Sequence, residues 1–236
     1  LGRLAGRRDG DAVGTGTAPY GTLLQAGSAG GGLLDPVLAP AAFPITRLDL
    51  DSALIAPLSA INTAGTGQVT SPLSEISRTS QTIIDESELS LIPPGSSIDW
   101  IAVRLAPGEA AYPPSEVIIP QYSIWLSSAT RSASAMSATF AANEGADRTL
   151  VRDGELRLLP GDLPSGALLA AFGKPIIFNR RGFIYRGGPL CITIDHAGTG
   201  IPSVGLDATE EPGPVRSSFS FGTQTTADVV GPGGIM

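Results

Sequence analysis

From residue 78 onward, apolar and polar residues alternate in short runs that end at Pro-Gly, Asp-Gly or Gly-Gly pairs. In "SSIDWIAVRLAPG" the alternation places two sets of side chains on opposite faces of a predicted strand: Ile98, Trp100, Ala102 and Arg104 against Asp99, Ile101, Val103 and Leu105. Similar runs are "EVIIPQYSIWLSS", "TLVRDGELRLLPG", "PIIFNRRGFIYRGGPLCITIDH" and "VRSSFSFGTQTTADVV". Together they predict an all-β fold of about seven to nine short strands, typical of an antiparallel β-sandwich or jelly roll.

Two places within this pattern need separate predictions. Asp153-Gly154 is the commonest signal for a tight hairpin, so we expect the short strands on either side of it to pair. The small-residue stretch 131–146 is the best helical candidate in the second half of the chain, with a loop as the alternative.

Residues 1–75 differ from the rest in being dominated by Gly, Ala, Pro, Ser and Thr. Their apolar residues come in pairs, such as Leu23-Leu24 and Leu33-Leu34, without a sustained period. The segment is too apolar and too weakly charged for a solvated tail. We therefore predict a long, irregular N-terminal arm over residues 1–75, covering its own domain or a neighbouring subunit, and a β-sandwich domain over residues 76–236.

The composition agrees with this organisation and narrows the expected partners. The chain has 30 Gly and 20 Pro residues. In a helix interior, each Gly costs about 1 kcal/mol and each Pro about 3 kcal/mol relative to Ala, so long helices are not expected. The net charge is −7 and no basic stripe with interleaved aromatic residues occurs, so nucleic acid is not an expected partner. No run of 18 apolar residues is present, and we expect no transmembrane segment.

The stretch "GGPLCITIDHAGTG" holds the only cysteine and the only histidine of the chain, Cys191 and His196, with Asp195 between them. Residues five apart on a strand face opposite sides of the sheet, so Cys191 and His196 cannot form a catalytic pair. Cys191 and Asp195 share a face but stand about 13 Å apart, at roughly 3.3 Å per residue. We therefore expect Cys191 to be a small, partly buried hydrophobic side chain and His196 to end the strand.

Other catalytic and metal-binding patterns are missing. A single cysteine and histidine cannot form a usual zinc site, and neither G-x-S-x-G nor G-x-x-x-x-G-K-[ST] occurs. The carboxylates that gather along the chain are Asp85, Glu86, Glu88, Glu144, Asp147, Asp153 and Glu155. A structural calcium ion or a glycosidase pair are the alternatives to solvated loop acids at these positions. We predict no catalytic, cofactor-binding or metal-binding residue, no cofactor, and no enzyme activity.

Four aromatic residues allow a different kind of site. Trp100, Trp125, Tyr112 and Tyr122 could form a stacking platform for sugars, although aromatic residues in alternating strands are more often part of a core. Solvent exposure of Trp100 or Trp125 would favour the platform, and burial of both would remove it.

The second half of the chain resembles secreted bacterial β-rich proteins, many of which carry a C-terminal sorting segment of the PEP-CTERM type. The resemblance covers roughly residues 78–200. Three motifs carry the resemblance. An Asn-x-Gly-x-Asp element is matched by Asn143, Gly145 and Asp147, and a V-x-x-G-x-L strand by Val151, Gly154 and Leu156. A Y-x-G-G-x-L-x-x-x-I-x-H-x-G ending is matched by Tyr185, Gly187, Gly188, Leu190, Ile194, His196 and Gly198. The C-terminal "ADVVGPGGIM" has no Pro-Glu-Pro, no apolar helix and no basic end, so anchoring by that route is not expected.

The resemblance implies an exported bacterial protein, periplasmic or on the cell surface, without catalytic residues. Combined with the arm, it predicts a non-catalytic structural subunit that docks into a larger assembly of other protein subunits, such as a surface layer, a filament or the periplasmic face of a membrane complex. The arm would do so by adding a strand to an exposed sheet edge. The alternatives are a glycan-binding β-sandwich module and a viral or phage jelly-roll shell protein.

Overall fold

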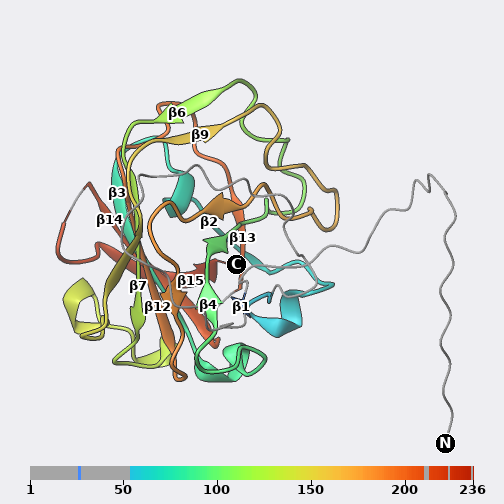
Figure 1. The fold of residues 1–236 in the computed structure, drawn as a ribbon. Coiled ribbons are helices and arrows are strands. Elements are labelled where there is room, and N and C mark those ends of the chain that lie inside the picture. Colours follow the sequence, from blue (N-terminus) through green and yellow to red (C-terminus); the bar gives the residue numbers. More distant parts are fainter. Residues whose placement is uncertain (1–25, 28–53, 210–212, 223, 235) are drawn as a thin grey trace, which may run out of the picture.

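The all-β prediction is confirmed by the computed structural model, which describes residues 26–27, 54–209, 213–222, 224–234 and 236 (Figure 1). Most of the strands form one antiparallel sheet of eight strands. Their order across the sheet is β2 (Gly67–Val69), β13 (Leu206–Thr209), β15 (Val229–Gly234), β14 (Val215–Phe221), β3 (Arg78–Ile84), β12 (Leu190–His196), β7 (Tyr122–Ser128) and β8 (Thr149–Arg152).

Three smaller sheets complete the strand pairing among the described residues. They are β1 (Ala26–Gly27) with β4 (Ser97–Ile98) and β11 (Phe183–Ile184), β5 (Trp100–Ile101) with β10 (Ile176–Ile177), and β6 (Val117–Ile119) with β9 (Leu156–Leu158).

Among the described residues, helical structure is limited to short 3-10 turns. They are η2 (Leu58–Ala60), η3 (Ser71–Leu73), η4 (Glu86–Leu89), η5 (Ala133–Ala135) and η6 (Phe140–Ala142). The stretch 131–146 therefore holds two single turns, η5 and η6, in place of one helix. In the described part of the chain, no helix has the length and apolarity needed to cross a membrane.

The hydrophobic core lies between one face of the large sheet, here called the inner face, and the smaller sheets. Alternation along β12 sends Leu190, Ile192 and Ile194 into this core, whereas Cys191 belongs to a separate cluster on the opposite, outer face. From the smaller sheets the core receives Ile98, Trp100, Ile101, Val117, Ile119, Leu156, Ile176 and Phe183. The arrangement is sandwich-like, because each layer buries the apolar face of the other.

The strands beside Asp153-Gly154 do not form the expected hairpin, and that prediction is wrong. β8 pairs with β7 in the large sheet, whereas β9 pairs with β6, which lies at the top of the view in Figure 1. Gly154 has a φ of +101° and its carbonyl accepts a hydrogen bond from the Tyr122 N–H at 2.9 Å. Glycine tolerates this conformation in any bend. The chain therefore turns sideways at Gly154 and carries the ribbon of paired strands beyond the large sheet.

Residues 54–75, which the composition groups with the arm, lie within the fold. Leu54, Ile55 and Ala56 are buried, and Ala56 exchanges two backbone hydrogen bonds with Met236, at 2.7 and 3.0 Å. Strand β2 forms one edge of the large sheet. These short apolar runs bury themselves against the sheet, a contact that composition alone does not reveal. The rest of the predicted arm, apart from β1, lies outside the described residues.

A buried ion pair holds the connection after η2 to the large sheet. Arg104 and Asp207 are each 1% exposed, and the Arg104 Nε lies 2.7 Å from an Asp207 carboxylate oxygen. The same guanidinium donates to the carbonyl oxygens of Ala60 and Thr63 at 2.9 and 2.7 Å, while Asp207 also accepts the Gly65 N–H at 2.9 Å. Both charges are thus surrounded by hydrogen-bonding partners, as buried charges require.

Candidate functional site

The outer face of the large sheet carries polar side chains along its middle. Across neighbouring strands, Trp125 of β7 faces Thr193 of β12, and Thr193 faces Gln81 of β3. In the next row, Asp195 lies beside Thr79. Successive residues on a strand face opposite sides, so these residues share one face, while the apolar residues that alternate with them in β7 and β12 enter the core.

The segment between β7 and β8, residues 129–148, folds back over this outer face. Near η5, Ala133 and Met136 pack on Ile83 and Cys191 in a small apolar cluster. Burial raises the pKa of the Cys191 thiol to about 12, so the thiolate is absent at neutral pH. Cys191 therefore has the structural role that the strand pattern predicts.

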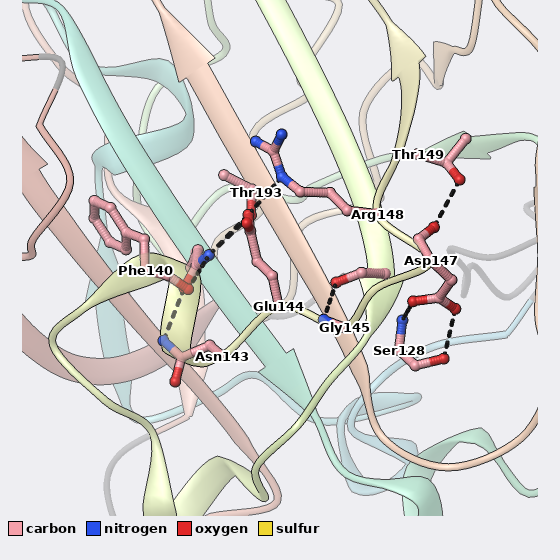
Figure 2. A network of polar contacts seen from close by, with 11 residues as sticks. Ser128, Phe140, Asn143, Glu144, Gly145, Asp147, Arg148, Thr149 and Thr193 are labelled. Atoms are coloured by element: carbon pink, nitrogen blue, oxygen red, sulfur yellow. Dashed lines mark hydrogen bonds and ion pairs between the residues drawn. The ribbon is translucent and has the colours of Figure 1, made fainter.

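Asn143, which is fully buried, anchors this covering segment to the sheet. Its Nδ2 donates to Gln81 Oε1 and to the Ser137 carbonyl, each at 2.8 Å, and its Oδ1 accepts the Ser137 N–H at 2.8 Å. Gln81 Nε2 lies within hydrogen-bonding distance of the Phe140 carbonyl at 3.1 Å (Figure 2). One amide pair, Asn143 with Gln81, thus ties both ends of η6 to the central strand.

Glu144 extends this network toward solvent. Its carboxylate accepts a hydrogen bond from Thr193 Oγ1 and forms an ion pair with Arg148 Nε, both at 2.8 Å (Figure 2). The Arg148 guanidinium lies over the Trp125 ring, 4.5 Å from its centre. The carboxylate, the guanidinium and the indole therefore form one connected group.

Gly145 and Asp147, the other two residues of the Asn-x-Gly-x-Asp element, also have structural roles. A Cβ at Gly145 would lie 2.5 Å from the Ser128 carbonyl oxygen, so only glycine allows this approach. Asp147 accepts hydrogen bonds from the Ser128 N–H and Oγ at 2.9 and 2.7 Å. All three residues of the element hold the covering segment on the sheet, which is a structural role.

Beside the covering segment lies a cavity of about 320 Å³ on the outer face. It is lined by Thr79, Trp125, Phe140, Ala141, Glu144, Arg148, Thr193, Asp195, Gln224 and Thr225. Trp125 is half-buried here. The hydroxyl of Thr79 has no hydrogen-bond partner, although the residue is only 6% exposed.

His196 lies on the other face of the sheet from Cys191, as the strand pattern predicts. Its Nε2 donates to the Ser71 carbonyl at 2.7 Å, and its Nδ1 accepts the Gly198 N–H at 3.0 Å. The ring stacks on Tyr122 with 5.7 Å between ring centres. Burial lowers its pKa, and both ring nitrogens are engaged, so this histidine is held neutral in the core.

The four aromatic residues do not form a common stacking platform. Trp100, Tyr112 and Tyr122 are 2%, 5% and 0% exposed, and all three belong to the core. Trp125 alone of the four lines the outer-face cavity. Among the residues that line this cavity, the aromatic pattern indicated Trp125 but not Thr79, Thr193 or Gln224. The signal that could have found this face is the alternation of "CITID" in β12, where Thr193 and Asp195 alternate with apolar residues.

The acidic residues singled out by the sequence do not converge on one point. Asp85 accepts the Ala133 N–H at 2.7 Å, whereas Asp153 accepts the Ser123 hydroxyl at 2.9 Å, a hydrogen bond that lowers the Asp153 pKa. Within the described ranges, no group of three or more His, Cys, Asp or Glu side chains is placed to hold a metal ion.

Comparisons with protein-family models, with curated proteins and with solved structures give no match to this chain.

Proposed function

We propose that the protein is a carbohydrate-binding β-sandwich module, and that the cavity beside Trp125 is its sugar site. The observation that carries the proposal is a half-buried indole in a cavity whose other walls are mostly hydroxyl, amide, carboxylate and guanidinium groups. Such a combination fits a sugar, which offers an apolar C–H face to the ring and many hydroxyls to polar side chains.

The polar groups of the cavity match the needs of vicinal hydroxyls. Glu144 and Asp195 accept hydrogen bonds, the Arg148 guanidinium donates them, and the Gln224 amide does both. The hydroxyl-bearing residues Thr193 and Thr225 complete the polar lining. A site built to bond hydroxyl groups discriminates strongly against ligands that lack them.

The size of the cavity limits the ligand to a small portion of a glycan. A volume of about 320 Å³ is near the lower end of the range of small-molecule sites, which is roughly 300–1,000 Å³. The Arg148 guanidinium covers one face of the Trp125 ring, 4.5 Å from its centre, so a sugar has only the rest of the indole to contact. We therefore expect one or two sugar residues at the end of a chain or in a side branch to be bound.

A panel of mono- and oligosaccharides, titrated while tryptophan fluorescence is recorded, tests the proposal. Trp125 is half-buried at the site and Trp100 is buried in the core, so binding should change mainly the Trp125 signal. We expect Trp125→Ala and Gln224→Ala each to weaken the best ligand at least tenfold. Thr226→Val, an exposed position outside the cavity, is the matched control. The proposal fails if no sugar binds, or if the two site variants bind as well as the control.

The prediction of an assembly subunit depends on the N-terminal arm, of which residues 1–53 lie almost entirely outside the described residues. It stays a prediction, as do export, the likeness to PEP-CTERM-associated proteins and the lack of catalytic activity. The native mass of the protein extracted from its source would test it, since a structural subunit should migrate with its partners and far above 24.0 kDa.

A further inference from the structure

A second cavity, of about 390 Å³, lies on the other side of the segment that joins the covering loop to β8. Side chains alternate along this segment. Arg148 lines the Trp125 cavity, whereas its neighbours Asp147 and Thr149 line the second one, and Figure 2 shows them on opposite sides. The remaining walls of the second cavity are Ser97, Arg181, Gly182, Phe183, Ile184 and Arg186.

The two arginines of this cavity differ from the other cations of the described chain. Arg181 and Arg186 are exposed and make neither a hydrogen bond nor an ion pair with any described residue. By contrast, ion pairs occupy Arg104, Arg148, Arg157, Lys174 and Arg180. Two guanidinium groups with all their donors available thus border one cavity of a protein whose net charge is −7.

The acidic residue in the cavity wall does not satisfy these arginines. The carboxylate of Asp147 accepts hydrogen bonds from the Ser128 N–H and Oγ, and it is turned toward Ser128 in Figure 2. Its negative charge is therefore used in holding the covering segment, and the donors of both arginines remain directed to whatever enters the cavity.

The backbone between the arginines is held in a fixed position against β4. A Cβ at Gly182 would lie 2.0 Å from Asp99 Oδ1 and 2.2 Å from Ser97 Oγ, so the chain runs in close contact with these side chains. Phe183 and Ile184 then pair with Ile98 and Ser97 in the small sheet. Arg181 lies two residues before this strand and Arg186 two residues after it, so the paired backbone between them favours a defined site.

We propose that this cavity binds an oxyanion, a carboxylate, sulfate or phosphate group, between Arg181 and Arg186. Guanidinium groups recognise such anions through paired N–H donors, and this geometry is the reason that arginine predominates at carboxylate and phosphate sites. The site is separate from the Trp125 cavity, and the inference goes beyond the proposed sugar binding and does not depend on it. The anion comes either from solution as a free ion or as part of an acidic oligosaccharide.

Titration of the full chain at constant ionic strength tests this inference by calorimetry and by backbone amide NMR shifts. The probes are sodium sulfate, sodium phosphate and a trisaccharide of galacturonic acid. We expect at least one probe to bind and to shift the amide signals of residues 181–186, and Arg181→Gln/Arg186→Gln to weaken it at least tenfold. Arg157→Gln/Arg180→Gln lowers the net charge by the same amount at exposed ion pairs and is the matched control.

Each outcome has a defined meaning. A trisaccharide that binds at least tenfold more tightly than the inorganic ions assigns the site to an acidic glycan, whereas equal affinities assign it to a free anion. If none of the probes binds, or if both double variants lose the same affinity, the site is refuted. Loss of sugar binding in Trp125→Ala with unchanged anion binding would show that the two sites are independent.

Discussion

Replacing Asn143 by alanine should destabilise the protein by about 2–5 kcal/mol, because it removes three hydrogen bonds of a fully buried amide. Gln81 Oε1, itself in a residue that is 0% exposed, loses the amide that donates to it, and a buried acceptor left in this state costs about 1–3 kcal/mol. The N–H and carbonyl of Ser137 are nearer to solvent, so water replaces the two lost bonds at a cost of about 0.5–1 kcal/mol each.

Asn179→Ala provides a matched control for this change. Asn179 also bonds to the N–H and carbonyl of one residue, Asp153, at 3.0 and 2.7 Å, but it is exposed. Its loss should cost less than about 1 kcal/mol. Urea unfolding followed by circular dichroism measures both values, and hydrogen exchange at the Ser137 amide reports local opening of the covering segment. Equal free energies of unfolding for the two variants would refute the argument that burial of Asn143 makes it an anchor.

Two further predictions concern buried charge and protonation. Burial lowers the folded-state pKa of His196, the single histidine, so stability should be full above about pH 6.5 and fall by up to about 1.4 kcal/mol per unit as the pH drops below it. Urea titrations across this range should show the slope, and His196→Gln should flatten it. Asp207→Ala leaves Arg104 buried without its carboxylate and should cost about 3–5 kcal/mol. Glu116→Ala, at an exposed pair, should cost less than about 1 kcal/mol in the same unfolding assay, and similar losses would contradict the reasoning.

Local alternation was sufficient to predict the fold class and the role of β12. Alternation from Leu190 to His196 determines which side chains share a face of the sheet. The placement of Cys191 and His196 on opposite faces therefore follows from the two-residue strand period alone. The burial of Trp100 and the partial exposure of Trp125 could not be read in the same way. Both occur in alternating strands, and only the covering segment, held through Asn143, decides which face forms a cavity.

The failed hairpin at Asp153-Gly154 has a related cause. A dipeptide signal specifies backbone conformations, and Gly154 does adopt the positive φ that the signal implies. Whether the chain then reverses or only bends depends on which strands are available to pair. Here β8 pairs with β7 and β9 pairs with β6, both of which precede the bend in the sequence. The Asp153-Gly154 dipeptide does not encode this long-range choice of partners.

The position of β3 at the middle of the large sheet has a consequence for how the chain reaches this structure. Ile84 of β3 pairs with Leu190 on one side and with Val215 on the other, so both neighbours are supplied by the last quarter of the chain. During synthesis β3 therefore leaves the ribosome long before either partner exists. One of its edges stays open until β12 is complete at residue 196, and the other until β14 is complete at residue 221. A sheet closed by such distant pairings has a high contact order and folds slowly, and its centre is exposed to aggregation in the meantime. The Ser, Thr and Gln residues of β3 lower the hydrophobicity of that strand while it waits.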